Sequence, residues 1–248
     1  MKIVILSSTR LDSFQQKVLQ PIVEDSAIEV VAALIDCHPH PSLKKRFIKN
    51  LKRGRGGYML IMLSKRYFVK KRPSIAAKEF FSAHGIPCIE TQEPYTEKTV
   101  ETIRNLNPEA MVMIGGFGII KEPLLSLTPR GILSYHHGNM RKYRGQPVGF
   151  WELYNNETEM GVTVQRLAAG IDKGTPIMER TIPIDPKDNV TTLREKALGN
   201  STDMMHETLR LIQQPDFKPA IIDHYGPIFT IPNLRQYLML QFKLLFRK

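Results

Sequence analysis

The sequence predicts an α/β protein built on a Rossmann-like, open and mostly parallel sheet with helices on both faces. Short apolar segments alternate with amphipathic helical segments along most of the chain, which is typical of parallel sheets. Several apolar segments are hydrophobic at successive positions, as strands are when helices cover both faces of their sheet. We expect this domain to span residues 1–213, with a basic helical insert at 41–73 and a helical C-terminal extension at 214–248.

The individual elements follow from the apolar runs and from residues that start and stop helices. Strands are expected at 2–8, 28–35, 87–91, 110–117, 131–136, 160–167 and 176–184. Helices are expected at 13–25, 74–85, 96–108 and 148–156, followed by one long helix or a helix pair over 189–213. Ser74 and Thr96 fit helix N-caps, and Gly85 fits a C-terminal stop. Ligands of such sheets bind beyond the carboxyl ends of the strands, which here means near residues 115–118 and His136.

The net charge of +11 belongs to one segment of the chain. Residues 41–73 hold twelve of the 35 Lys and Arg residues and no acid, so the other 23 basic residues nearly balance the 24 acidic ones. Nucleic-acid binding by the whole fold is therefore not indicated. Apolar residues recur at helical spacing in the insert, and the tail at 233–248 is also basic, apolar and free of acid. These segments predict a solvated basic hairpin packed on the domain, contact with an anionic lipid or an anionic acceptor, or self-association.

Composition also bounds the location and the chemistry. No apolar run is long enough for a secretion signal or a membrane span. Cys37 and Cys88 show no metal-ligand pairing, so we expect free reduced thiols and no metal site. The expected location is the cytoplasm, peripheral at the membrane if the basic segments bind lipid.

Residues 131–147, "GILSYHHGNMRKYRGQP", carry the candidate chemistry. Side chains alternate along a strand, so Ser134 and His136 share one face while Tyr135 and His137 point to the other. A neutral imidazole can accept a proton near pH 7, a carboxylate can orient it, and a hydroxyl can donate to an oxyanion. Asp172 lies in a glycine-bounded turn, and with Ser134 and His136 it would suit acyl transfer to an amine. From spacing alone, a purely structural role for His136 and Asp172 remains an open alternative.

The motifs "SYHHGNMRKYRG" and "GVTVQRLAAGIDKG" resemble the folate-dependent formyltransferase family in order and spacing. That family includes glycinamide ribonucleotide, methionyl-tRNA and amino-sugar formyltransferases. Its pattern is Asn-x-His, an Arg-Gly pair, Gly-Val-Thr, and a Gly-Leu/Ile-Asp-x-Gly turn. The resemblance extends back through "GGFGIIKEPLL" and "MKIVIL", so it covers about residues 1–213.

The resemblance implies a role for particular residues. His136 corresponds to the catalytic histidine and Asp172 to the catalytic aspartate, with 10-formyltetrahydrofolate as the formyl donor. The donor's pterin would lie against two segments, namely Phe117, Gly118, Ile119, Ile120 and Lys121, and Leu167, Ala168, Ala169, Gly170 and Ile171. The acceptor side would be lined by Arg144, Gly145, Gln146 and Asn139. Read without the resemblance, the glycines at 115–118 indicate only a tight connection.

The sequence departs from the family pattern at the oxyanion donor. Ser134 stands where the family has asparagine, so its hydroxyl is a shorter donor, and Asn139 or His137 are candidates to replace the missing amide. We expect transfer of a formyl group to a small amine, for example an amino sugar. One alternative is a formyltetrahydrofolate hydrolase, a related group that often has the His-His pair. The other is a folate-binding or scaffold protein without turnover.

Overall fold

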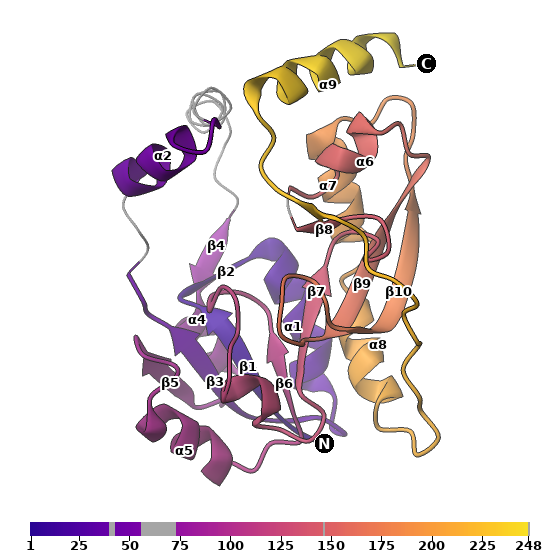
Figure 1. Ribbon diagram of the computed structural model, residues 1–248. Coiled ribbons are helices and arrows are strands. Elements are labelled where there is room, and N and C mark those ends of the chain that lie inside the picture. Colours follow the sequence, from indigo (N-terminus) through magenta and orange to yellow (C-terminus); the bar gives the residue numbers. More distant parts are fainter. Residues whose placement is uncertain (40–42, 56–72, 146, 248) are drawn as a thin grey trace.

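The computed structural model describes residues 1–39, 43–55, 73–145 and 147–247. Its centre is a seven-stranded sheet in the order β10-β9-β7-β6-β1-β3-β5 (Figure 1). The strands are β1 (Lys2–Ser8), β3 (Glu29–Asp36), β5 (Cys88–Thr91), β6 (Ala110–Met113), β7 (Ile132–His136), β9 (Glu159–Arg166) and β10 (Thr175–Pro183). The five neighbouring strands β7, β6, β1, β3 and β5 run parallel to one another. Strand β9 runs antiparallel to both of its neighbours, β7 and β10. The predicted open, mostly parallel sheet is confirmed.

Helices cover both faces of this sheet. Alternate residues of β1 belong to two different apolar clusters, with Ile3 and Ile5 on one face and Val4 and Leu6 on the other. The first cluster includes side chains of α1 (Ser13–Glu24), α4 (Ala77–Ala83) and α8 (Met204–Leu211). The second includes side chains of α5 (Glu97–Asn105) and of the short 3-10 helix η1 (Leu124–Ser126). Burial on both faces explains why the strands read as continuous apolar runs.

Two helix starts match local sequence signals. Asp12 caps α1 in a capping box with Gln15, and the Thr96 hydroxyl accepts from the Thr99 amide at the start of α5, as predicted. The segment 189–213 forms a helix pair, α7 (Val190–Gly199) and α8, and Asn189 caps the first of them.

The expected cap at Ser74 is wrong. Residues Ser74–Ala76 form a short strand, β4, that pairs antiparallel with β2 (Arg10–Asp12). The Arg10 Nε donates to the Ser74 hydroxyl at 2.9 Å, and helix α4 begins only at Ala77. A pairing partner more than 60 residues away in the chain overrides the local signal. The strand expected at 110–117 also ends earlier, at Met113, where the chain leaves the sheet for its glycine turn.

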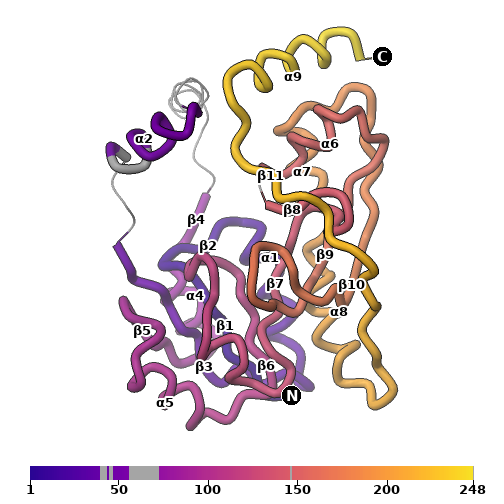
Figure 2. Tube along the Cα trace, viewed as in Figure 1, coloured from indigo at the N-terminus to yellow at the C-terminus, as the bar shows by residue number. Residues whose placement is uncertain are grey.

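The C-terminal segment returns to the sheet's carboxyl edge. Strand β11 (Ile228–Phe229) pairs in parallel with β8 (Arg144–Gly145), and Figure 2 shows the late segment running past β8 toward the final helix. That helix, α9 (Leu234–Phe246), packs on α6 (Phe150–Tyr154).

Part of the basic insert is described. Helix α2 (Leu43–Leu51) forms where helical spacing predicted it, whereas the second half of the expected hairpin, 56–72, lies outside the described residues. Across the described part of the chain, no helix combines the length and apolarity needed to span a membrane.

Candidate active site

The two adjacent histidines lie on opposite faces of β7. Ser134 pairs with Gln165 and His136 with Thr163 of β9, and all four side chains are buried. His137 stacks on Tyr135 on the other face, with ring centroids 5.4 Å apart, and both rings meet Phe14 edge-on. Only His136 therefore shares a face with Ser134, as strand periodicity predicts.

His136 contacts an acceptor with each ring nitrogen. Its Nδ1 lies 3.3 Å from Asp172 Oδ2, and its Nε2 lies 2.7 Å from the Tyr143 carbonyl oxygen. A carbonyl oxygen only accepts, so this short contact assigns a hydrogen to Nε2. Nδ1, beside the carboxylate, is then the ring atom that can gain or lose a proton. The structure thus brings together the histidine and the aspartate that the sequence places 36 positions apart.

Two hydrogen bonds hold the Asp172 carboxylate beside His136. Its Oδ2 accepts from the Gly145 amide at 2.8 Å, and its Oδ1 accepts from the Gln165 side chain at 3.2 Å. The side-chain oxygen of Gln165, Oε1, accepts a hydrogen bond from the Gly174 amide at 3.1 Å, which connects the turn to β9. Sequence reasoning missed Gln165. Its signal is a second polar residue, two positions after Thr163, in the run "VTVQ" of a buried strand.

Two glycines are required by close approach. A Cβ on Gly138 would lie 2.6 Å from His136 Nε2, so this position leaves room only for hydrogen. Gly145 has a φ of +89°, and a Cβ there would lie 2.2 Å from the Phe229 carbonyl oxygen. The first glycine positions the imidazole, and the second lets β11 pair with β8.

A small cavity lies beside His136. Its volume is about 10 Å³, enough for about one water molecule. Its walls include Tyr143, Arg144, Gly145, Trp151, Glu152 and Phe229. Glu152 is only 3% exposed, and burial raises the pKa of its carboxyl to about 7, with the nearby Glu157 adding to the effect. On the other face of β7, burial lowers the pKa of His137 to about 4, helped by His136 and Arg194.

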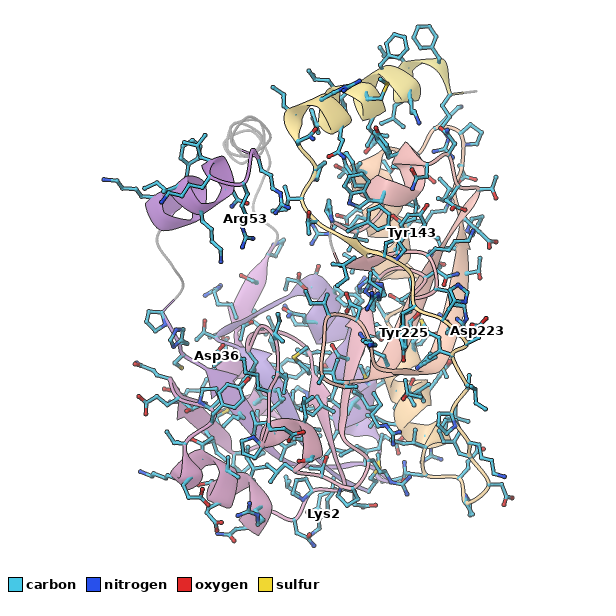
Figure 3. All side chains as sticks on the ribbon, viewed as in Figure 1. Lys2, Asp36, Arg53, Tyr143, Asp223 and Tyr225 are labelled. Atoms are coloured by element: carbon cyan, nitrogen blue, oxygen red, sulfur yellow. The ribbon has the colours of Figure 1, made fainter. Side chains whose placement is uncertain are left out.

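Two of the residues expected on the acceptor side, Arg144 and Asn139, form hydrogen bonds within the surrounding loops. The Arg144 Nε donates to the Gly226 carbonyl at 2.6 Å, another guanidinium nitrogen lies 3.3 Å from the Ile171 carbonyl, and the guanidinium lies 5.7 Å from the Tyr225 ring centre. Figure 3 shows Tyr143 and Tyr225 on the same side of the molecule. The Asn139 Oδ1 accepts from the Arg141 amide within the turn that leads to Tyr143. Gln146 lies outside the described residues.

The segments expected to hold the donor lie over one apolar cluster. Ile120 is buried in it, and Phe117 and Leu167 pack against it from the two loops. The Phe117 amide donates to Asp36 Oδ2 at 2.8 Å, and the Tyr95 hydroxyl lies 3.3 Å from both the Ile119 carbonyl and the Lys121 amide.

Much of both segments is open to solvent. Ile119 is 61% exposed, and residues 168–171 are exposed in the facing loop. Apolar side chains beside exposed backbone groups suit a flat ring whose edges carry hydrogen-bonding atoms.

The chain matches the sequence model described as "Formyl transferase" over residues 1–209. It belongs to the formyl transferase family. A methionyl-tRNA formyltransferase of Pelobacter propionicus is 30% identical over 142 residues, which are 57% of this chain and 44% of that protein. The matched region therefore spans less than half the length of that relative.

Solved structures share the fold of this chain. Glycinamide ribonucleotide transformylase 1 of Symbiobacterium toebii superposes with a TM-score of 0.60 at 17% identity, covering 90% of this chain and 94% of that one. An N-formyltransferase of Helicobacter canadensis, solved with folinic acid and dTDP-3-aminofucose, gives 0.61 at 15% identity and covers 98% and 80%. Within the described part of the chain, no three His, Cys, Asp or Glu side chains gather as a metal site would require.

Proposed function

We propose that this protein transfers a formyl group from 10-formyltetrahydrofolate to the amine of a small acceptor, an amino sugar being the leading candidate. The observation that carries the proposal is the contact between His136 Nδ1 and Asp172 at the carboxyl edge of the sheet, with Ser134 on the same face of β7. The Helicobacter canadensis structure, solved with a folate and a nucleotide-linked amino sugar, supports this acceptor class. The reaction needs no other partner, and we propose a cytoplasmic location for it.

His136 and Asp172 act together on the amine proton. The donor supplies an activated formyl carbon when it is bound. The Tyr143 carbonyl keeps the hydrogen on His136 Nε2, so Nδ1 accepts the proton from the attacking amine. Asp172 Oδ2 holds the imidazolium in place, while Gly145 and Gln165 keep the carboxylate from turning away. As the bond between the formyl carbon and the donor's nitrogen breaks, the imidazolium returns the proton to that departing nitrogen. A base positioned in this way contributes about 10²- to 10⁴-fold in rate.

Ser134 is the donor to the developing oxyanion. Its side chain is buried two residues before His136 and on the same face, so both groups reach one reacting centre. His137 does not replace the family's asparagine, because its ring packs on Tyr135 and Phe14 on the far side of β7. Asn139 serves the turn before Tyr143 through its Oδ1.

The remaining site residues keep their predicted roles in this proposal. Segments 117–121 and 167–171 hold the donor over their shared apolar cluster. Arg144 and Gly145 border the acceptor, with two of the five guanidinium donors of Arg144 already used in the loop.

Incubation with 10-formyltetrahydrofolate tests the proposal directly. The donor is supplied alone, with a panel of amino sugars and their nucleotide-linked forms, and with glycinamide ribonucleotide. Consumption of donor that depends on an amino sugar is the expected result. Consumption without any amine identifies a hydrolase, and tight binding without consumption identifies a silent folate-binding protein. Either of these two results overturns the proposal.

A further inference from the structure

Helix α9 leaves an apolar stripe in solvent. Its inner face, with Tyr237 and Leu240, is buried in the main core. Leu238 is 55% exposed and Phe242 59% exposed. At 100° per residue, the exposed apolar side chains fall within one continuous face of the helix. These residues are Leu234, Leu238, Met239, Phe242, Leu245 and Phe246. A helix of a monomer seldom shows so many large apolar groups side by side.

Helix α2 presents exposed basic residues together with exposed apolar ones. Lys44 and Lys49 are exposed on the helix, and Lys52 and Arg53 are exposed in the turn that follows it, beside Leu51 at 56% exposure. The run 43–55 holds no acidic residue, and neither does 233–248. Both helices therefore combine apolar side chains with uncompensated positive charge.

A residue just past α2 contacts a residue just before α9. The Arg55 guanidinium, just past α2, donates to the Thr230 hydroxyl at 2.7 Å. The Trp151 indole donates to the carbonyl of the same Thr230 at 3.1 Å, a few residues before α9 begins. Both helices lie at the same end of the molecule in Figure 1, and Arg53 lies on the side of α2 that faces the C-terminal segment in Figure 3. We call the exposed faces of α2 and α9 the α2–α9 surface.

We propose that the α2–α9 surface docks the protein on an anionic lipid bilayer. Leu238, Phe242 and Phe246 would enter the boundary between headgroups and acyl chains, where basic amphipathic helices bind. Lys49, Lys52 and Arg53 would meet the lipid phosphates. A second copy of the chain fits this surface less well, because it would bring two acid-free basic surfaces together.

The helix lies on the bilayer and does not cross it. Thirteen residues make α9 about 20 Å long, whereas the hydrocarbon core is about 30 Å thick. The Lys243 Nζ donates to the Tyr154 carbonyl at 2.6 Å, so α9 is fixed to α6 and hence to the wall of the cavity beside His136. The docked protein would hold its candidate active site in a set orientation at the bilayer surface.

Co-sedimentation of the full chain with vesicles tests this proposal independently of turnover. We expect binding to vesicles of equimolar phosphatidylcholine and phosphatidylglycerol, weakened by salt, and no binding to phosphatidylcholine alone. Phe242→Glu should weaken binding about 10- to 100-fold, because it removes one inserted side chain. Replacing Lys49, Lys52 and Arg53 by Gln should weaken it about fivefold per charge.

Ile221→Glu is the matched control, since Ile221 is 94% exposed on the segment between α8 and β11. This variant should bind vesicles as the unaltered chain does, and thermal melting checks that all variants fold. Unchanged binding by Phe242→Glu, or equal binding to neutral vesicles, overturns the proposal. So does a dimer in lipid-free sedimentation that Phe242→Glu dissociates, because the occupant would then be a second copy.

Discussion

The two faces of β7 place the same side chain in opposite surroundings. His136 meets backbone and carboxylate groups that come from the loops 138–145 and 170–174. His137, the next residue, is enclosed by Tyr135, Phe14 and the region around Ser201. One face is built by loops that supply polar partners, and the other by helices that supply apolar cover. The reactivity of a histidine at a strand end is therefore set by what packs on its face, because the strand itself treats both residues alike.

Exchanging each histidine should give the largest contrast. His136→Ala is expected to lower kcat about 10²- to 10⁴-fold, because the amine loses its proton acceptor. His137→Phe keeps an aromatic ring against Tyr135 and should leave kcat nearly unchanged. Single-turnover formyl transfer with the best acceptor from the panel measures both. Equal losses in the two variants would show that both faces take part in the reaction.

Gly138→Ala tests whether loop packing positions His136. The new Cβ would lie 2.6 Å from Nε2, so the imidazole must move off the Tyr143 carbonyl. A misplacement of about 1 Å can cost about 10²-fold, so a loss of that size in kcat is expected. Gly199→Ala is the matched control, because a Cβ there has no neighbour within 4 Å. Full activity of Gly138→Ala would mean that His136 works in another position.

Ser134→Asn tests the departure from the family pattern. A longer amide donor on the same face should strengthen the hydrogen bond to the oxyanion by about 1 kcal/mol, which raises kcat about fivefold. The increase should appear in kcat and not in the acceptor's KM. A fall in kcat would instead indicate that this site has adapted to a hydroxyl.

Two buried groups near β7, Glu152 and His137, should make the free energy of unfolding depend on pH. Burial raises the pKa of Glu152 from 4.5 to about 7 and lowers the pKa of His137 from 6.5 to about 4. The Glu152 contribution is complete below pH 4.5 and is lost as the pH rises through about 7. The His137 contribution is complete above pH 6.5 and is lost as the pH falls toward about 4.

The two contributions to the free energy of unfolding therefore change in opposite directions between about pH 4 and pH 7. A variant that lacks one group should show the pH dependence caused by the other. As the pH rises from 4.5 to 8, the free energy of unfolding of Glu152→Gln should increase by about 3 kcal/mol relative to that of the unaltered chain. As the pH falls from 8 to 5, that of His137→Phe should increase by about 2 kcal/mol on the same scale. Urea unfolding at these pH values measures both. Parallel pH profiles for all three chains would contradict the assignment.

Strand periodicity was enough to separate the two histidines, and apolar runs were enough to predict an open, mostly parallel sheet. The order of its strands was not predicted, and neither were the backbone groups that bind His136 and Asp172. The Tyr143 carbonyl and the Gly145 amide are backbone groups, so the identity of their side chains carries no signal for their position. Gln165 donates to Asp172 across the turn that follows β9, whose shape the sequence pattern does not specify. Ser74 lies in a strand that pairs with Arg10–Asp12, and Gly145 binds Asp172 27 positions away, so these two features depend on contacts between distant parts of the chain.

The pairing of β8 with β11 has a consequence for synthesis on the ribosome. The loop that carries Tyr143 and Gly145 is held by Gly226 and Pro227, and the Arg144–Gly226 contact joins residues 82 positions apart. At about 5 to 20 residues per second, the ribosome needs roughly 4 to 16 seconds to add that length of chain. A nascent chain stalled before Gly226 should therefore be cut by protease within 140–145, whereas the full chain released from the ribosome should resist. The loop that contacts His136 and Asp172 would then be among the last parts of the protein to become rigid.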